Sequence, residues 1–270
     1  MGLYMHEIDR TSLIETAHAL ADAARVETLA HFRHEGLEID NKAASGFDPV
    51  TAADRATEAV MRRILTGRRP DDAILGEEMG QTTGTSGLVW VLDPIDGTRA
   101  YLSGTPTWGV LIAVADSTGP RFGIIDQPWT GERFYGGFGQ AQLDGPHGSR
   151  ALRTRPERSL NQAILFSTYP EVGTRAEQDA FDALSARVRM TRYGMDCYAY
   201  ALLALGQIDL VVEAGLQPYD IQAPIAVIEA AGGLVTDWKG GPAVDGGRVI
   251  AAANRGIHAA ALDLLSGADV

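Results

Sequence analysis

Two aspartates, separated by two residues, follow a strongly apolar stretch of the chain. Asp93 and Asp96 follow the apolar residues 88–92, with a proline between them and Gly97 and Thr98 directly after. An apolar run bounded by Pro and Gly predicts a buried strand that ends in a turn, and the proline keeps Asp93 out of helical geometry. The N–H groups of Gly97 and Thr98 then begin a short helical segment. Carboxylates beside such N–H groups predict a place where divalent cations and a phosphate meet.

Two further acidic clusters lie far away in the sequence. Glu77 and Glu78 precede the apolar stretch, and Glu213 and Asp220 come long after it. Each cluster alone fits a solvated surface turn as well as a binding site. Three acidic strand ends separated by core-like segments favour a hard cation, because Mg²⁺ prefers a few carboxylates together with water and substrate phosphate. The sequence therefore predicts a Mg²⁺ centre of two or three ions, with Mn²⁺ as an alternative metal.

The acidic motifs together resemble a known family. They are G-E-E at residues 76–78, D-P-I-D-G-T at 93–98, and a late D-x-x-A-P at 220–224 followed by a run of Glu, Ala and Gly. From about Leu37 to Ala260 the chain resembles the inositol monophosphatase family of Mg²⁺-dependent phosphatases. The haloacid dehalogenase type does not fit, because its acids are spaced D-x-D and the first is a covalent nucleophile. The resemblance implies an α/β protein folded as an α-β-α-β-α layered sandwich, usually a homodimer.

The resemblance also implies roles for single residues. Asp93 bridges two metal ions; the Glu77 carboxylate and the Ile95 carbonyl complete one site, and Asp96 and Asp220 complete the other. The amides of Gly97 and Thr98 hold the phosphate. Water activated on the Glu77 side attacks phosphorus in line, with no covalent enzyme intermediate. Glu78 fits direct involvement, at a lid or a third metal, as well as a supporting place behind the ligands.

Asp54 has two interpretations that are compatible with each other. Thr51 can cap the helix that follows, with Asp54 in its first turn, where a carboxylate favours the helix dipole. The segment from Val50 to Asp54 also matches the family's V-T-x-x-D. There Asp54 binds the Thr98 hydroxyl, which helps to deprotonate the attacking water as a general-base relay. Lys42 matches a family lysine near the entrance of the site, and it also fits a solvated loop lysine.

The residues expected to face the leaving group favour a cationic substrate. Residues 193–200, around Asp196, and residues 209–221 resemble the histidinol-phosphate phosphatase branch of the family, whereas inositol phosphatases tend to have a small residue in place of Asp196. Histidinol phosphate carries an ammonium and an imidazole, so carboxylates at Asp196, Glu213 and Asp220 suit it. A neutral polyol gains less from buried charge. Alternatively, Asp196 only caps a helix.

The expected function is therefore hydrolysis of L-histidinol phosphate to histidinol and phosphate in histidine biosynthesis. An inositol-1-phosphate phosphatase is the alternative. A nucleotide or sugar bisphosphatase and a non-catalytic regulatory binding protein are further possibilities, and the intact acidic set argues against the last.

Composition narrows the range of partners. The 270 residues include 23 Lys and Arg against 35 Asp and Glu, a net charge of −12 that disfavours nucleic acid or an anionic membrane as a direct partner. Cys197 is the only cysteine, which excludes an intramolecular disulfide and a thiolate zinc site. No run has the length of a membrane span, and the first residues lack a signal-peptide pattern. We expect a cytoplasmic enzyme that acts on a small phosphate monoester.

Alternating helical and strand periodicities predict the α/β elements that must position these residues. Ser12 and Glu15 form a capping-box pattern at the start of the first predicted helix. Gly139–Arg155, rich in Gly and Pro, predicts a junction between two lobes. The first, residues 1–145, is an α+β lobe with most metal ligands, and the second, residues 146–270, is an α/β lobe with the substrate-selecting residues. Predicted helices are 12–34, 51–66, 175–186, 196–205 and 221–231, and predicted strands are 73–75, 88–93, 109–115, 121–127, 133–136, 163–166, 210–213 and 249–253, with a loop over 36–49.

Overall fold

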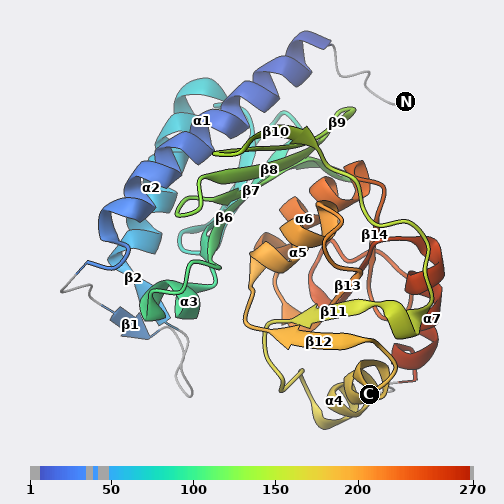
Figure 1. Ribbon diagram of the computed structural model, residues 1–270. Helices are drawn as coiled ribbons and strands as arrows, with labels where there is room; N and C mark the ends of the chain where they lie inside the picture. The colour runs from blue at the N-terminus through green and yellow to red at the C-terminus, as the bar shows by residue number, and fades with distance from the viewer. Residues whose placement is uncertain (1–6, 35–38, 42–48, 268–270) are drawn as a thin grey trace.

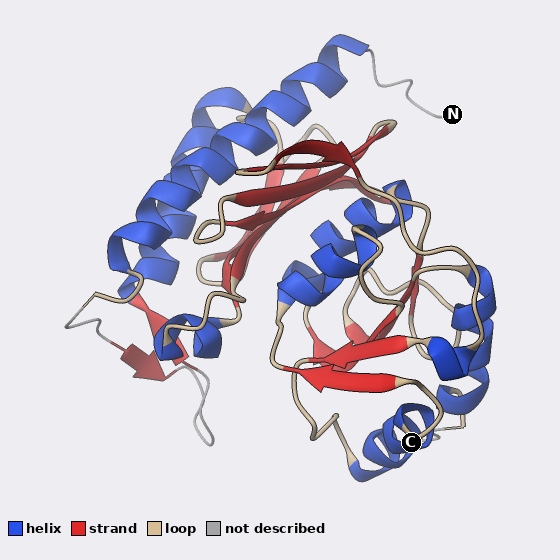
Figure 2. Cartoon of the chain, viewed as in Figure 1, coloured by secondary structure: helices blue, strands red, loops and turns tan. Residues whose placement is uncertain are grey.

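The chain folds into alternating layers of helix and sheet. The structure, a computed structural model, describes residues 7–34, 39–41 and 49–267. Helices α1 (Glu7–His31) and α2 (Ala52–Arg68) cover one face of an eight-stranded sheet, and α5 (Cys197–Ala204) and α6 (Pro218–Ala230) cover its other face (Figure 1). A five-stranded sheet lies beyond α5 and α6, and α4 (Arg175–Ser185) and α7 (Arg255–Leu265) cover its outer face (Figure 2). The predicted α-β-α-β-α sandwich is confirmed.

The two large sheets differ in how their strands are connected. The eight-stranded sheet has the order β10-β9-β8-β7-β6-β5-β3-β4, and all its pairs are antiparallel except β3 with β5. The five-stranded sheet has the order β12-β11-β13-β15-β14, in which β11 runs parallel to both of its neighbours. The strands are β3 (Ala73–Gly76), β4 (Gly80–Thr82), β5 (Val89–Asp96), β6 (Gly109–Asp116), β7 (Gly119–Gln127), β8 (Glu132–Gly137), β9 (Gln140–Gly145), β10 (Gly148–Ala151), β11 (Ile164–Ser167), β12 (Met190–Tyr193), β13 (Leu210–Leu216), β14 (Leu234–Thr236) and β15 (Gly247–Ala252). A separate pair, β1 (Ile39–Asn41) and β2 (Pro49–Thr51), lies near the short helix α3 (Thr98–Ser103).

Alternate residues of the central strands face opposite helix layers. On β5, Trp90 and Leu92 pack with α1 and α2, whereas Val91 packs with α5 and α6. Side chains of a strand alternate between the two faces of a sheet, so a strand covered on both faces is apolar throughout. This is why the apolar run before Asp93 lies in the middle of the molecule. Full burial of each such large side chain contributes about 1.5–3 kcal/mol.

Several predicted boundaries are wrong. The first helix is already formed at Glu7, so Ser12 lies inside it and does not begin it with a capping box. The predicted junction Gly139–Arg155 contains the hairpin of β9 and β10, which ends at Ala151. The chain also forms elements that were not predicted: β4, β12, β14, α7, the strand pair β1–β2 and the 3₁₀ helix Leu160–Gln162. The strands β1, β2, β4, β12 and β14 have three or four residues each, too few for an alternating pattern to be recognised.

The division into two lobes, predicted at residue 145, stays a prediction, and strand β10 bears on where the boundary lies. Strand β10 follows residue 145 and completes the sheet of the N-terminal lobe. We propose that the lobes divide after Ala151. The core is nevertheless shared, because α5 and α6 of the C-terminal lobe pack on Leu111, Ile125 and Phe134 of the first sheet.

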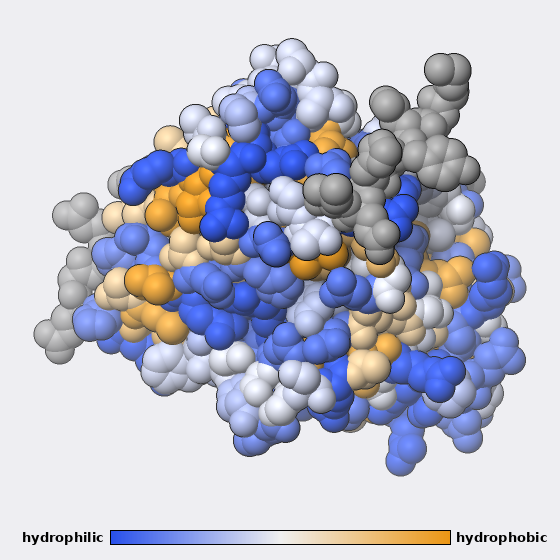
Figure 3. Space-filling model, turned by 90° about the horizontal axis from the view of Figure 1, so that it is seen from above, coloured by the Kyte–Doolittle hydropathy of each residue, from blue (hydrophilic) through white to orange (hydrophobic). Residues whose placement is uncertain are grey.

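The face of the molecule seen from above (Figure 3) is largely polar. The face drawn in Figure 3 is mostly hydrophilic, with small hydrophobic areas scattered among polar residues. Among the described helices, none combines the length and apolar composition that crossing a bilayer requires.

Candidate active site

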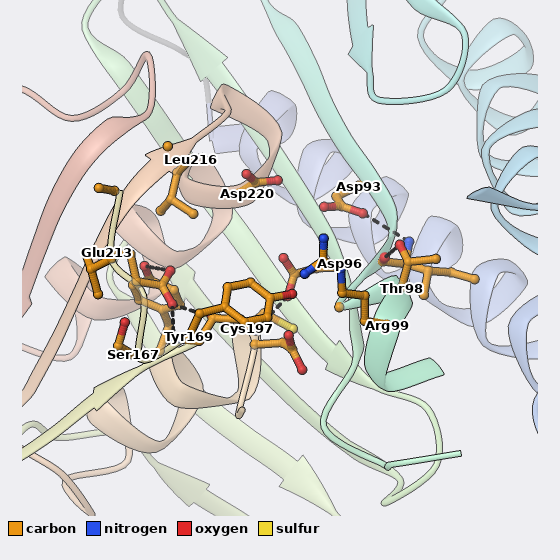
Figure 4. A pocket seen from close by; sticks show the side chains of 18 of the residues that line it. Asp93, Asp96, Thr98, Arg99, Ser167, Tyr169, Cys197, Glu213, Leu216 and Asp220 are labelled. Atoms are coloured by element: carbon orange, nitrogen blue, oxygen red, sulfur yellow. Dashed lines mark hydrogen bonds between the residues drawn. The ribbon is translucent and has the colours of Figure 1, made fainter. Parts of the chain in front are cut away.

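A pocket of about 300 Å³ opens between the two lobes, and most of the predicted site residues line it. From the N-terminal lobe it is lined by Glu77, Asp93, Ile95, Asp96, Gly97 and Thr98, and from the C-terminal lobe by Asp196, Glu213 and Asp220. Figure 4 shows Asp93, Asp96 and Asp220 pointing toward one another, with Glu213 farther along the same pocket. Residues from three distant motifs therefore meet in one place.

The end of β5 presents two carboxylates because the strand is irregular there. Its register with β6 shifts between Asp93 and Asp96, which pair with Leu111 and Gly109. A bulge of this kind redirects side chains and ends regular pairing. The Asp93 Oδ1 atom accepts a hydrogen bond from the Ile95 N–H at 3.0 Å and so fixes the turn.

Gly97 continues this turn in a conformation that glycine favours. Its φ is 84°, in the left-handed region, and it directly precedes α3. A Cβ at this position would lie 2.7 Å from the Asp196 Cγ atom. The absence of a side chain thus lets the Asp196 carboxylate approach the end of β5.

The third carboxylate, Asp220, comes from the first turn of α6. That helix begins at Pro218, earlier than predicted, and proline is well suited to the first helical position. The Asp220 Oδ2 atom accepts the Gln217 N–H at 2.7 Å, which caps the helix and orients the carboxyl group. Ligand atoms of Asp93, Asp96 and Asp220 all lie within 4.8 Å of one another.

The acidic groups disturb each other's protonation. Burial, together with Glu77, Asp96 and Asp220, raises the pKa of Asp93 well above its ordinary value. Burial, together with Asp196 and Asp220, likewise raises the pKa of Asp96. Burial is also the main reason that the pKa of Asp220 is raised to about 7, with Glu77 and Glu213 adding to it.

This donor set fits a hard divalent cation. All its side-chain donors are oxygens, they converge from distant parts of the sequence, and burial together with neighbouring carboxylates raises their pKa values. A cation bound between them would compensate their negative charge. Asp93, Asp96 and Asp220 are the residues that would hold it, and Glu77 lies beside Asp93.

The structure describes only some of the contacts expected for the predicted proton relay between Thr98 and Asp54. Asp54 is buried in the first turn of α2, as predicted. The Thr98 hydroxyl donates to the Ile95 carbonyl oxygen at 3.3 Å. The proton relay from Thr98 to Asp54 stays a prediction. Lys42 lies outside the described residues, and so does the Thr51 side chain.

Two pocket carboxylates join the lobes. The Asp96 Oδ2 atom accepts the Cys197 N–H at the start of α5, at 2.6 Å. The Asp196 Oδ2 atom accepts the Thr107 hydroxyl of the N-terminal lobe at 3.0 Å. Asp196 occupies the N-cap position of α5 but makes no side-chain capping bond, so the interpretation of Asp196 as a simple cap is wrong. Asp96 satisfies an N–H at the start of the helix instead.

Glu213 is held by its own lobe. Its Oε1 atom accepts the Thr168 N–H at 2.9 Å and the Thr168 hydroxyl, and its Oε2 atom accepts the Tyr200 hydroxyl at 2.8 Å. Burial raises the pKa of Glu213, while the bonds from Thr168 and Tyr200 oppose the rise. Burial also raises the pKa of Asp196, and the Thr107 hydroxyl opposes it. The C-terminal wall of the pocket is therefore acidic as well.

The mouth of the pocket contains two residues that the motifs did not single out. The Arg99 guanidinium lies over the ring of Tyr169, 5.0 Å from its centroid, and joins α3 to the loop after β11. Arg99 directly follows the D-P-I-D-G-T motif, so its position in the sequence was a usable signal. Tyr169 follows the carboxyl end of a parallel strand, where ligands commonly bind.

Known proteins match this chain over nearly its full length. The profile described as "Inositol monophosphatase family" matches residues 9–268. The chloroplastic bifunctional phosphatase IMPL2 of Arabidopsis thaliana is 39% identical, over 96% of this chain and 76% of that protein. The histidinol-phosphatase of Mycobacterium tuberculosis is 34% identical, over 87% of this chain and 91% of that protein.

A solved structure agrees with these matches. An inositol monophosphatase from Zymomonas mobilis superposes with a TM-score of 0.82 and 39% identity, covering 94% of this chain and 97% of that one. The fold of this chain is thus shared with a solved protein that is also similar in sequence. The chain belongs to the inositol monophosphatase family and is a metal-dependent phosphomonoester hydrolase.

Proposed function

We propose that this phosphatase hydrolyses L-histidinol phosphate to histidinol and inorganic phosphate. The observation that carries the proposal is the placement of Asp196 and Glu213 on the wall of the pocket whose floor holds Asp93, Asp96 and Asp220. The three carboxylates of the floor suit cations and a phosphate. The two carboxylates of the wall, Asp196 and Glu213, suit a positively charged leaving group. The similarity to a histidinol-phosphatase supports the same substrate.

The reaction transfers the phosphoryl group to water. Divalent cations, when bound, activate the attacking water and stabilise the leaving oxygen. Glu77, Asp93, Asp96, Asp220 and the Ile95 carbonyl would hold them. The N–H groups of Gly97 and Thr98 would orient the phosphate. Asp54 would accept the proton of the attacking water through the Thr98 hydroxyl, and the ester oxygen would leave with a proton taken from solvent.

The two wall carboxylates are suited to different roles. Both oxygens of Glu213 already accept hydrogen bonds from Thr168 and Tyr200, so Glu213 would act chiefly through its charge. Asp196 uses Oδ2 for Thr107, which leaves Oδ1 as the better acceptor for the ligand's ammonium group. A neutral polyol would have to desolvate these carboxylates without compensating their charge.

The test compares D196N with the native enzyme on histidinol phosphate and on myo-inositol 1-phosphate, in saturating Mg²⁺. A charge-assisted hydrogen bond is worth about 1.5–3 kcal/mol, so we expect kcat/KM for histidinol phosphate to fall about 10- to 150-fold. Turnover of inositol phosphate should change little. T107V is the matched control, since it frees the Asp196 carboxylate but keeps its charge, and it should have a smaller effect.

Inositol 1-phosphate is the second candidate, because the Zymomonas mobilis protein at 39% identity is named an inositol monophosphatase. Faster native turnover of inositol 1-phosphate, with equal effects of D196N on both substrates, would favour it. Hydrolysis of neither would point to a nucleotide or sugar bisphosphate. A binding protein would keep its partner after chelation, whereas the enzyme would lose its activity.

Three further properties belong to this proposal. Mg²⁺, in two or three ions, is the proposed physiological metal, and the protein is proposed to act as a homodimer in the cytoplasm. These properties rest on the family resemblance. Light scattering of the purified protein would test the dimer, and titration calorimetry would count the ions.

A further inference from the structure

Glu58 is a fully buried carboxylate that the motifs did not single out. It lies on α2, one helical turn beyond Asp54, and its side chain has no exposed area. Its Oε2 atom accepts the Glu78 N–H at 2.7 Å, and its Oε1 atom accepts the Met79 N–H at 3.1 Å. The two residues that follow Glu77 are therefore both bound through their backbone to one side chain.

The same carboxylate also contacts the residue before Glu77. A Cβ on Gly76 would lie 2.1 Å from the Glu58 Oε1 atom, so the carboxylate occupies the space where a side chain would be. Any larger residue at 76 would displace Glu58. The turn from β3 to β4 is thus held against α2 on both sides of Glu77.

Arg62 completes this attachment. Its Nε atom donates to Glu58 Oε1 at 2.7 Å, and its guanidinium also donates to the carbonyl oxygen of Gly80, at the start of β4. The pair offsets the cost of burying a charge, because a buried carboxylate needs both a partner and hydrogen bonds. The backbone of the turn is consequently bound through the Gly80 carbonyl oxygen and through the N–H groups of Glu78 and Met79.

The opposite side of Glu77 is bound to the strand that carries the metal ligands. The Glu77 N–H donates to the Leu92 carbonyl oxygen at 3.2 Å, immediately before Asp93. Glu77 therefore lies between β5 and the Glu58 carboxylate, and its backbone has little freedom to move away from Asp93. Groups that orient a metal ligand in this way commonly affect metal affinity by about 10- to 100-fold.

We propose that Glu58 is a positioning residue that sets metal affinity by holding Glu77 beside Asp93. The inference rests on the proposed role of Glu77 as a metal ligand. A carboxylate is required because the Glu58 side chain must accept hydrogen bonds from two N–H groups and a guanidinium at once. In E58Q one oxygen becomes an NH₂ group, which cannot accept a hydrogen bond from Glu78 or Met79.

The experiment measures Mn²⁺ binding by calorimetry and by electron paramagnetic resonance, without substrate. We expect E58Q to weaken Mn²⁺ binding about 10- to 100-fold with the circular dichroism spectrum retained. Turnover should recover largely when Mg²⁺ is raised, so the Mg²⁺ activation constant shifts more than kcat does. E58D, which keeps the charge, should lie between E58Q and the native protein, and it serves as the test if E58Q does not fold.

D72N is the matched control for simple loss of stability. Asp72 is another buried carboxylate of the same lobe, bound to Arg69 and to the Trp90 indole N–H, and it lies at the other end of β3. D72N should lower the melting temperature without changing Mn²⁺ affinity. Unchanged Mn²⁺ binding in E58Q, or equal weakening in D72N, would overturn the proposal.

A double-mutant cycle separates this inference from the role of Glu77 itself. If Glu58 acts through Glu77, then E58Q should cause no further loss of Mn²⁺ affinity in an E77Q background. Additive losses would show that Glu58 acts by another route. If E77Q alone leaves Mn²⁺ affinity unchanged, then Glu77 is not a ligand, and that part of the proposed function fails independently.

Discussion

Asp220 should destabilise the metal-free protein at neutral and alkaline pH, and its replacement by asparagine should therefore stabilise it. The carboxyl group lies near Asp93 and Asp96, and burial, with smaller contributions from the charges of Glu77 and Glu213, raises its pKa from 3.8 to about 7. The folded chain then binds a proton that the unfolded chain releases between these two pH values. Since the folded state holds more protons there, the free energy of unfolding falls as pH rises from about 4 to about 7.

The size of this effect follows from the pKa difference. Each pKa unit corresponds to about 1.36 kcal/mol, so a rise from 3.8 to about 7 amounts to at most about 4 kcal/mol at pH 8. At pH 5 the same group lowers the free energy of unfolding by only about 1.5 kcal/mol. In D220N the charge is absent, while the Asn oxygen can still accept the Gln217 N–H that caps α6.

The assay is urea unfolding of native protein and D220N at pH 5 and pH 8, in EDTA and in Mg²⁺. In EDTA, D220N should be more stable by about 2–4 kcal/mol at pH 8 and by about half as much or less at pH 5. In Mg²⁺ the order should reverse, because only the native protein gains the full free energy of binding the ion. A D220N protein that is less stable than native in EDTA at pH 8, or a difference independent of pH, would refute the reasoning.

Two predictions concern the end of β5. D93N should lower kcat/KM by at least about a thousandfold, because it removes the carboxylate shared by the proposed metal sites. Its melting temperature in EDTA should stay the same or rise. Substantial phosphate release by D93N would contradict the proposed reaction. G97A places a Cβ 2.7 Å from the Asp196 Cγ atom at a φ of 84°, so we expect a loss of about 1–3 kcal/mol in stability and about 100-fold in kcat/KM, with native kinetics in G97A as the refuting outcome.

Much of the fold could be predicted because its signals are local. The strand before Asp93 is apolar throughout, and the Pro and Gly residues of the motif 93–98 direct the turn that follows. The helices with clear periodicity were located to within a few residues. The hairpin of β9 and β10 was missed because β10 is exposed throughout and β9 buries only Leu143, so neither strand has an alternating apolar pattern.

The candidate ligands for cations and phosphate could be predicted from the chain alone, because their types and spacing are a local property of three short motifs. How these residues meet depends on the tertiary fold. Asp96 receives the N–H of Cys197, 101 residues away, and Asp196 receives the hydroxyl of Thr107, 89 residues away. Glu58 holds the Glu77 turn from a different helix. Such contacts depend on how α2, α5 and α6 pack against the sheets, and packing is set by the whole apolar core rather than by the neighbours of any one residue.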